Sequence, residues 1–558
     1  MRILFLFVWF HGIGFTPLSA APAPRIVNIY NFVRENDFRL KDSEAVLFEA
    51  TARQIELIKS LKLPATFALE YDALIKTNYQ ELFKQRLPTN CEIGGWFEIP
   101  QSLVERAGLK WRGQHEWDPA ANVGFSPGYT PEERRTLVDA YMADFKRIFG
   151  FYPKTVGCWF IDEVALAYLA EKYGIVASCN CKDQIGTDGY TVWGGYWNQA
   201  YYPSRLNAYM PAQTRRGQID VPIFRMLGSD PIYQHGTTPG MWTLEPVYPK
   251  AGGSSQWVSW FLNSLSEGPS LAFGYTQAGQ ENSFGWNAMK VGLTLQLEQI
   301  AADSKAGKLT VMTLAQAGDW FRSHFPITPA TAVVALDDWK HQGRKTVWYE
   351  SRFYRLNVLW QDGTLFIRDL HCFDQRIVSP THATPLKETS LSYETLPLVD
   401  WAVWSKSGPG AGMWPVVVGS DGSASAIEAD GTPVVKELSS TDLSIQQPLK
   451  NGGKFSILCA EKRITFTAVD GKGNPLKWAC NFIGGTQLKA MVRSVSTSRL
   501  AFTHSGVEYQ LELGAGSCLQ LEDGSLQLQP NRAGKIVLKL DTRSVAAIMK
   551  SADVVGQK

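Results

Sequence analysis

The stretch 155–182 constrains the fold more than any other part of the chain. It reads TVGCWFIDEVALAYLAEKYGIVASCNCK. The apolar run 156–161 predicts a strand, 164–173 predicts a helix, and 175–179 predicts a second buried strand. A strand, a helix and a strand so close together are typical of a parallel βαβ unit.

Two carboxylates, Asp162 and Glu163, follow the first of these strands. Parallel α/β folds carry their reactive groups at the carboxyl ends of the strands, where the loops gather. Side chains alternate along a strand, so only one of the two acids can face such a site. Asp is also a favoured helix N-cap, and the structural alternative is that Asp162 caps the helix that follows.

Strands and helices alternate throughout residues 22–328. Further strands are predicted at 26–32, 64–70, 91–99, 221–227 and 270–275, with helices at 43–61, 131–149 and 287–301. Thr130-Pro-Glu-Glu133 predicts a capping box at the start of the second of these helices. The alternation runs about seven times and predicts an α/β fold, a (β/α)7-type barrel, complete or incomplete.

Residues 329–545 have a different pattern. Short strands are separated by Asp-Gly dipeptides at 362, 421, 430 and 523. This pattern predicts an all-β sandwich region, either undivided or split into two subdomains near residue 435. Residues 546–558 are predicted to be a C-terminal tail.

Composition narrows the functional classes. The formal net charge is +2 and charged residues make up 19% of the chain, so nothing indicates a nucleic-acid partner. Aromatic residues make up 12% and include 19 Trp, a content that suits either the binding of sugar rings or a large aromatic core. A chain of 558 residues is expected to form two or three domains.

The front of the chain indicates export. Met1–Ala21 has Arg2, a short apolar run and then small residues, which is typical of a cleaved signal peptide rather than a membrane anchor. We therefore expect a periplasmic or extracellular protein with no membrane span. Eight Cys in a chain this long make no disulfide framework, and Cys179 and Cys181 are interpreted as core residues.

Glycosidic cleavage needs two carboxyl groups, one to donate a proton and one to act as nucleophile or to activate water. Strand ends supply several. Asp162 is the predicted nucleophile, with Glu163 as its alternative. Glu281, in a loop after a late strand, is the predicted acid/base, with Asp230 second.

Substrate binding is assigned to aromatic and polar side chains near the same strand ends. The Gly-rich segment 186–202 predicts a loop with exposed rings, and a long loop over 100–129 carries polar groups. The predicted substrate-binding residues are Trp96, Glu98, His115, Asp188, Trp193, Tyr196 and Trp197.

Four short motifs in this order resemble the polysaccharide deacetylase superfamily. They are Ala65-Thr-Phe67, Glu92-Ile-Gly94, Trp159-Phe-Ile-Asp-Glu163 and Glu171-Lys-Tyr-Gly-Ile175. The resemblance covers about residues 25–328 and implies a barrel that also occurs in the family-57 and family-38 glycoside hydrolases. Those enzymes carry β-sandwich domains after the barrel.

Departures from the family pattern bear on the metal. The deacetylases hold a metal with a strand-one Asp pair and a His-x-x-x-His motif, whereas this chain has Asn28, Tyr30 and Asn31 in strand one and no such His pair. A zinc site needs three or four ligands at fixed geometry. The family-57 enzymes need no metal, and the resemblance to them implies a nucleophile at Asp162 and an acid at Asp230 or Glu281.

The sequence therefore predicts a secreted glycoside hydrolase, retaining by analogy, that acts on a poly- or oligosaccharide without a metal or other cofactor. The alternatives are a polysaccharide deacetylase with an atypical site and a non-catalytic glycan-binding protein. The oligomeric state stays open.

Overall fold

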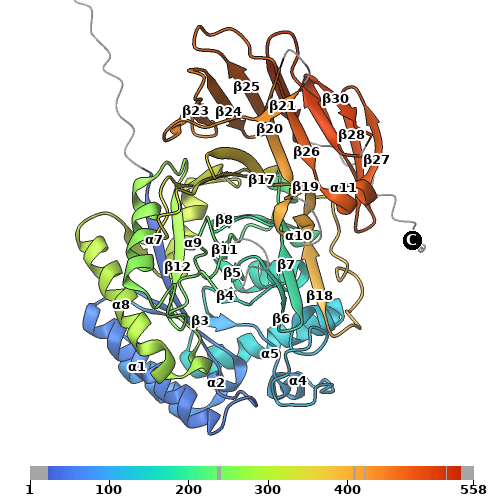
Figure 1. Ribbon diagram of the computed structural model, residues 1–558. Helices are drawn as coiled ribbons and strands as arrows, with labels where there is room; N and C mark the ends of the chain where they lie inside the picture. The colour runs from blue at the N-terminus through green and yellow to red at the C-terminus, as the bar shows by residue number, and fades with distance from the viewer. Residues whose placement is uncertain (1–22, 235–240, 406–409, 420–422, 523, 542–558) are drawn as a thin grey trace, which may run out of the picture.

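The computed structural model describes residues 23–234, 241–405, 410–419, 423–522 and 524–541. The predicted signal peptide and C-terminal tail lie outside these ranges. Figure 1 shows an α/β region, residues 23–330, beside an all-β region, residues 331–541. The predicted classes, mixed α/β with a parallel sheet followed by an all-β region, are confirmed. No helix in the described ranges is long and apolar enough to cross a bilayer.

The α/β region is built on a parallel sheet with strand order β12-β1-β2-β3-β4. The strands are β1 (Arg25–Val33), β2 (Thr66–Leu69), β3 (Glu92–Trp96), β4 (Val156–Gly157) and β12 (Gly274–Ala278). β1 pairs with β12 through its first half and with β2 through its second half, and β13 (Thr310–Met312) also pairs with β1. All the strands of β1 to β4 run in the same direction, so their carboxyl ends share one edge.

A second small sheet continues this succession. β5 (Ser178–Asn180) pairs in parallel with β11 (Ile223–Arg225), and β8 (Ala200–Tyr201) pairs with β11 in the antiparallel direction. A parallel bridge between Thr155 and Ala177, the residues directly before β4 and β5, joins the two sheets. On the other side, the Gly228 amide donates to the carbonyl of Gln277, in β12, at 3.3 Å.

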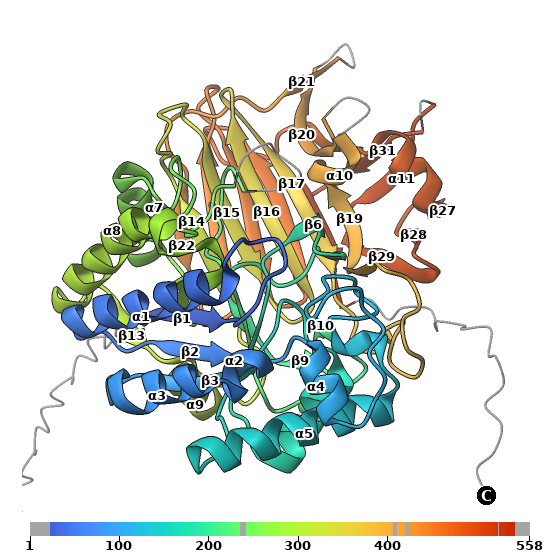
Figure 2. The same ribbon diagram turned by 90° about the horizontal axis from the view of Figure 1, so that it is seen from below.

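Helices lie at the periphery of the parallel strands (Figure 2). Their bounds are α1 Ser43–Leu61, α2 Tyr71–Ile75, α3 Thr77–Arg86, α4 Gln101–Arg106, α5 Pro131–Phe149, α6 Glu163–Tyr168, α7 Ser255–Glu267, α8 Trp286–Lys305 and α9 Leu314–His324. The capping box of α5 is present, with the Thr130 and Glu133 side chains each bonded to the other's backbone. The predicted bounds of α1 and α5 are confirmed.

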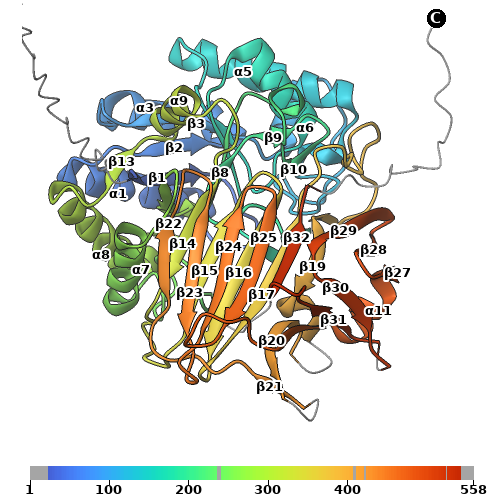
Figure 3. The ribbon, with the colours of Figure 1, turned by 90° about the horizontal axis from the view of Figure 1, so that it is seen from above.

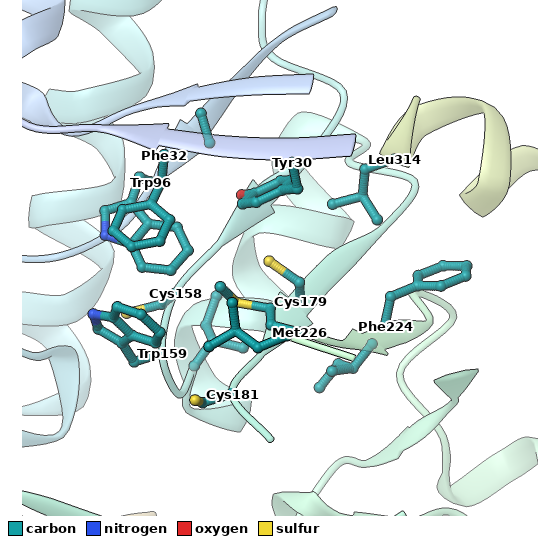
Figure 4. Close-up of a cluster of buried hydrophobic side chains, with 14 of the residues drawn as sticks. Tyr30, Phe32, Trp96, Cys158, Trp159, Cys179, Cys181, Phe224, Met226 and Leu314 are labelled. Atoms are coloured by element: carbon teal, nitrogen blue, oxygen red, sulfur yellow. The ribbon is translucent and has the colours of Figure 1, made fainter. Parts of the chain in front are cut away.

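A cluster of buried side chains packs against the parallel strands (Figure 4). Phe32 stacks on Trp96 with ring centroids 4.1 Å apart, and Trp159 meets Trp96 edge-on at 5.5 Å. Cys179 and Cys181 are fully buried beside them, as the sequence predicts. Trp96 is also fully buried, so it belongs to this core and is not a surface for substrate.

The β region consists of two large sheets around one shared core (Figure 3). The first has the order β14-β15-β16-β17-β20-β26-β31-β30, and the second has the order β22-β23-β24-β25-β32-β29-β28-β27. The chain enters the second sheet at β22 (Val434–Glu437), close to the suggested division near residue 435. However, β26 (Trp478–Ile483), β30 (Ser517–Gln520) and β31 (Leu526–Gln529) return to the first sheet.

The remaining strands of this region have the following bounds. They are β14 Thr331–Ala335, β15 Lys345–Glu350, β16 Tyr354–Gln361, β17 Thr364–Cys372, β19 Leu396–Asp400, β20 Gly412–Val418, β21 Ala424–Ala426, β23 Leu443–Pro448, β24 Lys454–Ala460, β25 Arg463–Val469, β27 Val492–Ser496, β28 Arg499–His504, β29 Val507–Ala515 and β32 Lys535–Lys539. Two short helices, α10 (Trp401–Trp404) and α11 (Gly485–Met491), interrupt them.

Two local predictions are wrong. The strand predicted at 156–161 is only β4, Val156–Gly157, although Cys158 and Trp159 still form backbone hydrogen bonds with Cys179 and Cys181. The helix predicted at 164–173 is present, as α6 and a π-helical turn, Leu169–Tyr173. The segment 186–202 is not a loop. It forms β7 (Tyr190–Trp193) and β8, and β7 pairs in parallel with β18 (Leu391–Glu394) of the β region.

Candidate active site

Four charged side chains lie just beyond the carboxyl ends of neighbouring parallel strands. Arg34 directly follows β1, Glu70 directly follows β2, Glu98 comes two residues after β3, and Glu281 comes three residues after β12. Because the ends of parallel strands meet at one edge, these side chains converge. Three acids, Glu70, Glu98 and Glu281, therefore gather at one place.

Arg34 is the centre of this cluster. Its Nε and Nη2 donate to the two oxygens of Glu98 at 2.8 and 2.6 Å, and its Nη1 donates to Glu281 Oε2 at 2.9 Å. The Trp117 indole donates to Glu98 at 3.1 Å, and its ring lies 4.3 Å from the Arg34 guanidinium. A bidentate guanidinium–carboxylate pair with a stacked ring is a rigid arrangement, so Glu98 is firmly held.

Glu70 lies beneath this pair and is completely buried. Neither of its carboxylate oxygens accepts a hydrogen bond from a described residue, and Arg34 Nε is 3.9 Å away. Burial, and then the nearby charge of Glu98, raise the pKa of Glu70 well above its usual range. Its surroundings therefore favour the neutral form of Glu70 more than water does.

Glu281 has access to a cavity of about 360 Å³, which it lines with an 11% exposed side chain. Burial raises its pKa to about 7, and the charges of Glu98 and Asp188 add to the rise, whereas Arg34 and Ser283 oppose it. A carboxyl group with this pKa is present in both protonation states near neutral pH. Such a group can donate and accept a proton during one catalytic cycle.

The cavity is lined by charged, polar and aromatic side chains from several strand ends. Apart from Glu281 they include Asp37, Arg39, Trp159, Lys182, Asp188, Tyr190, Glu245, Tyr248 and Phe284. Lys182 comes two residues after β5, so the strand-end rule could have found it. Glu245 lies in an irregular segment between β11 and α7, and no sequence pattern indicates it.

Asp162 does not line this cavity. It is completely buried at the N-cap of α6, where Oδ1 accepts from the amides of Val164 and Ala165 and from Arg134 Nη1, each at 3.0 Å. Ser126 donates to its other oxygen. Both carboxylate oxygens are thus bonded to structural partners outside the cavity, so the geometry gives no support for pairing Asp162 with Glu281.

Glu163 and Asp230 are also held by local partners. Glu163 is bonded to His382 at 2.9 Å, and burial raises its pKa. Asp230 is fully buried and accepts from the amides of Ile232 and Tyr233 and from two indoles, those of Trp257 and Trp339, at 2.8 to 2.9 Å. Neither residue lines the cavity of Glu281.

The expectation of exposed rings in 186–202 is wrong. Trp193, Tyr196 and Trp197 are each at most 4% exposed. The Trp193 indole donates to Asp400 at 2.6 Å, and Trp197 stacks on Trp348 at 4.2 Å, so both pack against the β region. The Tyr196 hydroxyl donates to the Pro329 carbonyl at 2.8 Å.

The other predicted binding residues have separate locations. Asp188, in the turn before β7, lines the cavity and lies 3.4 Å from Arg39 Nη1. His115 is exposed and stacks on Phe38 at 3.9 Å. Glu98 lies behind Glu281 and contacts it through Arg34.

The residues at this edge do not fit a metal ion. Arg34 places a positive charge in the middle of the three carboxyl groups, at hydrogen-bonding distance from two of them. A metal cation there would be repelled by the guanidinium. In the described part of the chain, no group of three or more His, Cys, Asp or Glu is arranged as metal ligands.

No protein-family model matches the chain, and no curated protein matches it. A solved structure of a candidate glycoside hydrolase/deacetylase from Parabacteroides distasonis is 15% identical with a TM-score of 0.50, over 67% of this chain and 91% of that one. A candidate polysaccharide deacetylase from Mycobacterium smegmatis is 11% identical with a TM-score of 0.35, over 55% of this chain and 93% of that one. A 4-alpha-glucanotransferase from Thermococcus litoralis is 10% identical with a TM-score of 0.28, over 93% and 98%. The first similarity shows a shared fold.

Proposed function

We propose that this protein is a carbohydrate-active enzyme, a glycoside hydrolase in which Glu281 is the general acid. Cleavage needs one carboxyl group that is still protonated at the working pH and a second one that is ionised. The observation that carries the proposal is the position of Glu281, which lines the cavity while burial raises its pKa to about 7.

Asp188 is the second carboxylate in this proposal, in place of Asp162. It lines the same cavity, and its charge contributes to the raised pKa of Glu281. Burial raises the pKa of Asp188, but Arg34 and Arg39 limit the rise. Because these two guanidinium groups favour its charged form, we assign Asp188 as the carboxylate that stays ionised when Glu281 carries its proton.

The fold supports this assignment. We infer that β1 to β5, β11 and β12 form a seven-stranded barrel, for which the Thr155–Ala177 bridge and the Gly228–Gln277 hydrogen bond are the supporting contacts. The structure with the shared fold is named as a glycoside hydrolase/deacetylase candidate, and both activities act on glycans.

In the proposed reaction, Glu281 donates its proton to the glycosidic oxygen while Asp188 attacks the anomeric carbon. The bond between that carbon and the glycosidic oxygen breaks, the leaving sugar departs as an alcohol, and a glycosyl ester forms on Asp188. Arg34 holds Oε2 of Glu281, which leaves Oε1 for the proton. Water then attacks the anomeric carbon and gives its proton to the Glu281 carboxylate. The sugar leaves Asp188 as a free carboxylate, so both acids return to their first states.

A panel of plant, algal and host glycans, screened for released sugar, tests the proposal. Glu281→Gln and Asp188→Asn should each lower turnover at least about a hundredfold, the low end for general acid–base catalysis. Glu298→Gln, an exposed acid on α8, is the matched control and should leave turnover unchanged. Normal turnover by Glu281→Gln would overturn the assignment.

The same panel separates the alternatives. Release of acetate without release of sugar would indicate deacetylation. Binding of a glycan with no product on any substrate would indicate a binding protein.

We also propose that the protein is exported, on the basis of Arg2 and the apolar run after it. N-terminal sequencing of the secreted or periplasmic fraction should find a start near Ala21 or Pro22. Mature protein that still begins at Met1 would contradict the proposal.

A further inference from the structure

Lys182 is a buried cation with few partners. It is only 2% exposed, yet it lines the cavity of Glu281. Its ammonium carries three N–H donors, and the described residues offer it one hydrogen bond, to Gln184 Oε1 at 3.1 Å, and no ion pair within 4 Å. Burying a charge is costly unless it is paired, so a side chain of this kind in a cavity points to a ligand that completes its hydrogen bonds.

Glu245 lines the same cavity and complements Lys182. It is 5% exposed, and its Oε2 accepts from the Thr243 hydroxyl at 2.8 Å, which leaves Oε1 without a described donor. Burial raises the pKa of Glu245, and the positive charge of Lys182 opposes the rise. The cavity therefore presents unused donors and an unused acceptor that influence each other electrostatically.

The charges around the cavity disfavour an anionic ligand. Apart from Glu281, three acids line it, Asp37, Asp188 and Glu245, against two bases, Arg39 and Lys182. Behind them, Arg34 is already paired with Glu98 and Glu281. A carboxylate or sulfate placed against Lys182 would meet the repulsion of these acids in a partly desolvated space.

We propose that Lys182 and Glu245 form a subsite for an uncharged sugar residue, in which Lys182 donates to one hydroxyl and Glu245 accepts from its neighbour. The subsite excludes uronic acids and sulfated sugars. Trp159 and Tyr248, which also line the cavity, offer apolar faces for the ring. This inference rests on the proposed function, whose substrate class it specifies.

Binding can be measured in Glu281→Gln, so that turnover does not enter. The probes are glucose and glucuronate, galactose and galacturonate, and mannose and mannuronate, followed by saturation-transfer NMR. In the pair whose neutral sugar binds, that sugar should bind at least tenfold more tightly than its uronate. Equal or tighter binding of the uronate in every pair, or no binding of any neutral sugar, overturns the proposal.

Variants test the two side chains. In the Glu281→Gln background, Lys182→Met and Glu245→Leu should each weaken binding of the neutral sugar at least fivefold, and Glu245→Gln, which keeps an acceptor oxygen, should recover part of the loss. Lys436→Met, an exposed lysine in β22, is the matched control.

Unchanged affinity in folded Lys182→Met overturns the role of Lys182, and the sugar–uronate comparison decides the proposal if that variant does not fold. Failure of Glu281 as an acid would appear as normal turnover and would leave these affinities as they are.

Discussion

Burial and charge act on Glu281 in opposite directions. Removal from water favours the neutral carboxyl group, and so do the charges of Glu98 and Asp188, while Arg34 favours the ionised one. Burial prevails, with the pKa at about 7 although a guanidinium lies 2.9 Å away. Arg34 donates two hydrogen bonds to Glu98 but only one to Glu281, so the two neighbouring acids have different surroundings.

The pH dependence of activity and stability follows from Glu281. As general acid it must be protonated, so kcat/KM should fall as the pH rises through about 7. The folded-state pKa lies above the ordinary value of 4.5, so the folded protein holds this proton more tightly than the unfolded chain does. The free energy of unfolding should therefore decrease between pH 4.5 and about 7.

Glu281→Gln serves as the comparison for this prediction. Its unfolding free energy, measured by urea titration at several pH values, should lose the decrease that Glu281 causes. If the variant and the wild type show the same slope across this range, the pKa of Glu281 is not raised.

At the scale of elements, the carboxylate at the N-cap of α6 stabilises the fold through its hydrogen bonds and its ion pair. Asp162 caps the helix and at the same time neutralises Arg134, which is completely buried and also donates to the Thr381 carbonyl of the β region at 2.7 Å. The strand-end position of Asp162 is thus used for helix capping and for holding a buried cation.

Asp162→Asn should lower the free energy of unfolding by about 3–5 kcal/mol, because it leaves the buried charge of Arg134 uncompensated. Turnover per folded molecule should stay near normal. Asp42→Asn, at the N-cap of α1 where the side chain makes no capping hydrogen bond, should change stability by less than about 0.5 kcal/mol. Loss of turnover in folded Asp162→Asn would return Asp162 to the catalytic site.

The segment from β7 to β8 is part of the core. Trp197→Ala should lower the free energy of unfolding by about 3–5 kcal/mol, as removal of a buried Trp does. Phe151→Ala, at a ring that is 49% exposed, should have a much smaller effect. Chemical denaturation measures both. A stable Trp197→Ala variant with weakened glycan binding would instead support the original expectation of a binding ring.

At the scale of the whole molecule, a buried network of ion pairs joins the two regions. Asp183 accepts from Arg225 at 2.7 Å within the α/β region and from Arg355 of β16 at 2.5 Å across the boundary. Arg355 also forms a bidentate pair with Asp369 of β17, at 2.8 and 2.7 Å. The two regions therefore share buried charges that neither could satisfy alone.

Arg355→Met removes the cation that bridges the two regions. It should lower the free energy of unfolding by about 3–5 kcal/mol, because Asp183 and Asp369 lose a buried partner. Arg499→Met, which removes an exposed ion pair with Glu512, should cost less than about 1 kcal/mol. Calorimetry of both variants measures the difference. An Arg355→Met protein as stable as the wild type would show that the regions do not depend on this network.

Local sequence determined the elements whose ends are encoded nearby. The 3.6-residue period determined α1, and the Thr130 capping box determined the start of α5, because both depend on contacts within a few residues. The strand-end rule placed Glu281 at the edge of the sheet where the carboxyl ends of the parallel strands lie. The class of each region followed from the same periodic patterns.

Only the tertiary structure decided how these elements use their side chains. The rings of 186–202 lost their expected exposure because distant segments pack on them, as Asp400 does on Trp193 and Trp348 does on Trp197. Asp162 accepts hydrogen bonds from Arg134 and Ser126, whereas Glu281 lines a cavity. The burial and the pKa of a side chain depend on which distant segments enclose it, and the local sequence does not specify those contacts.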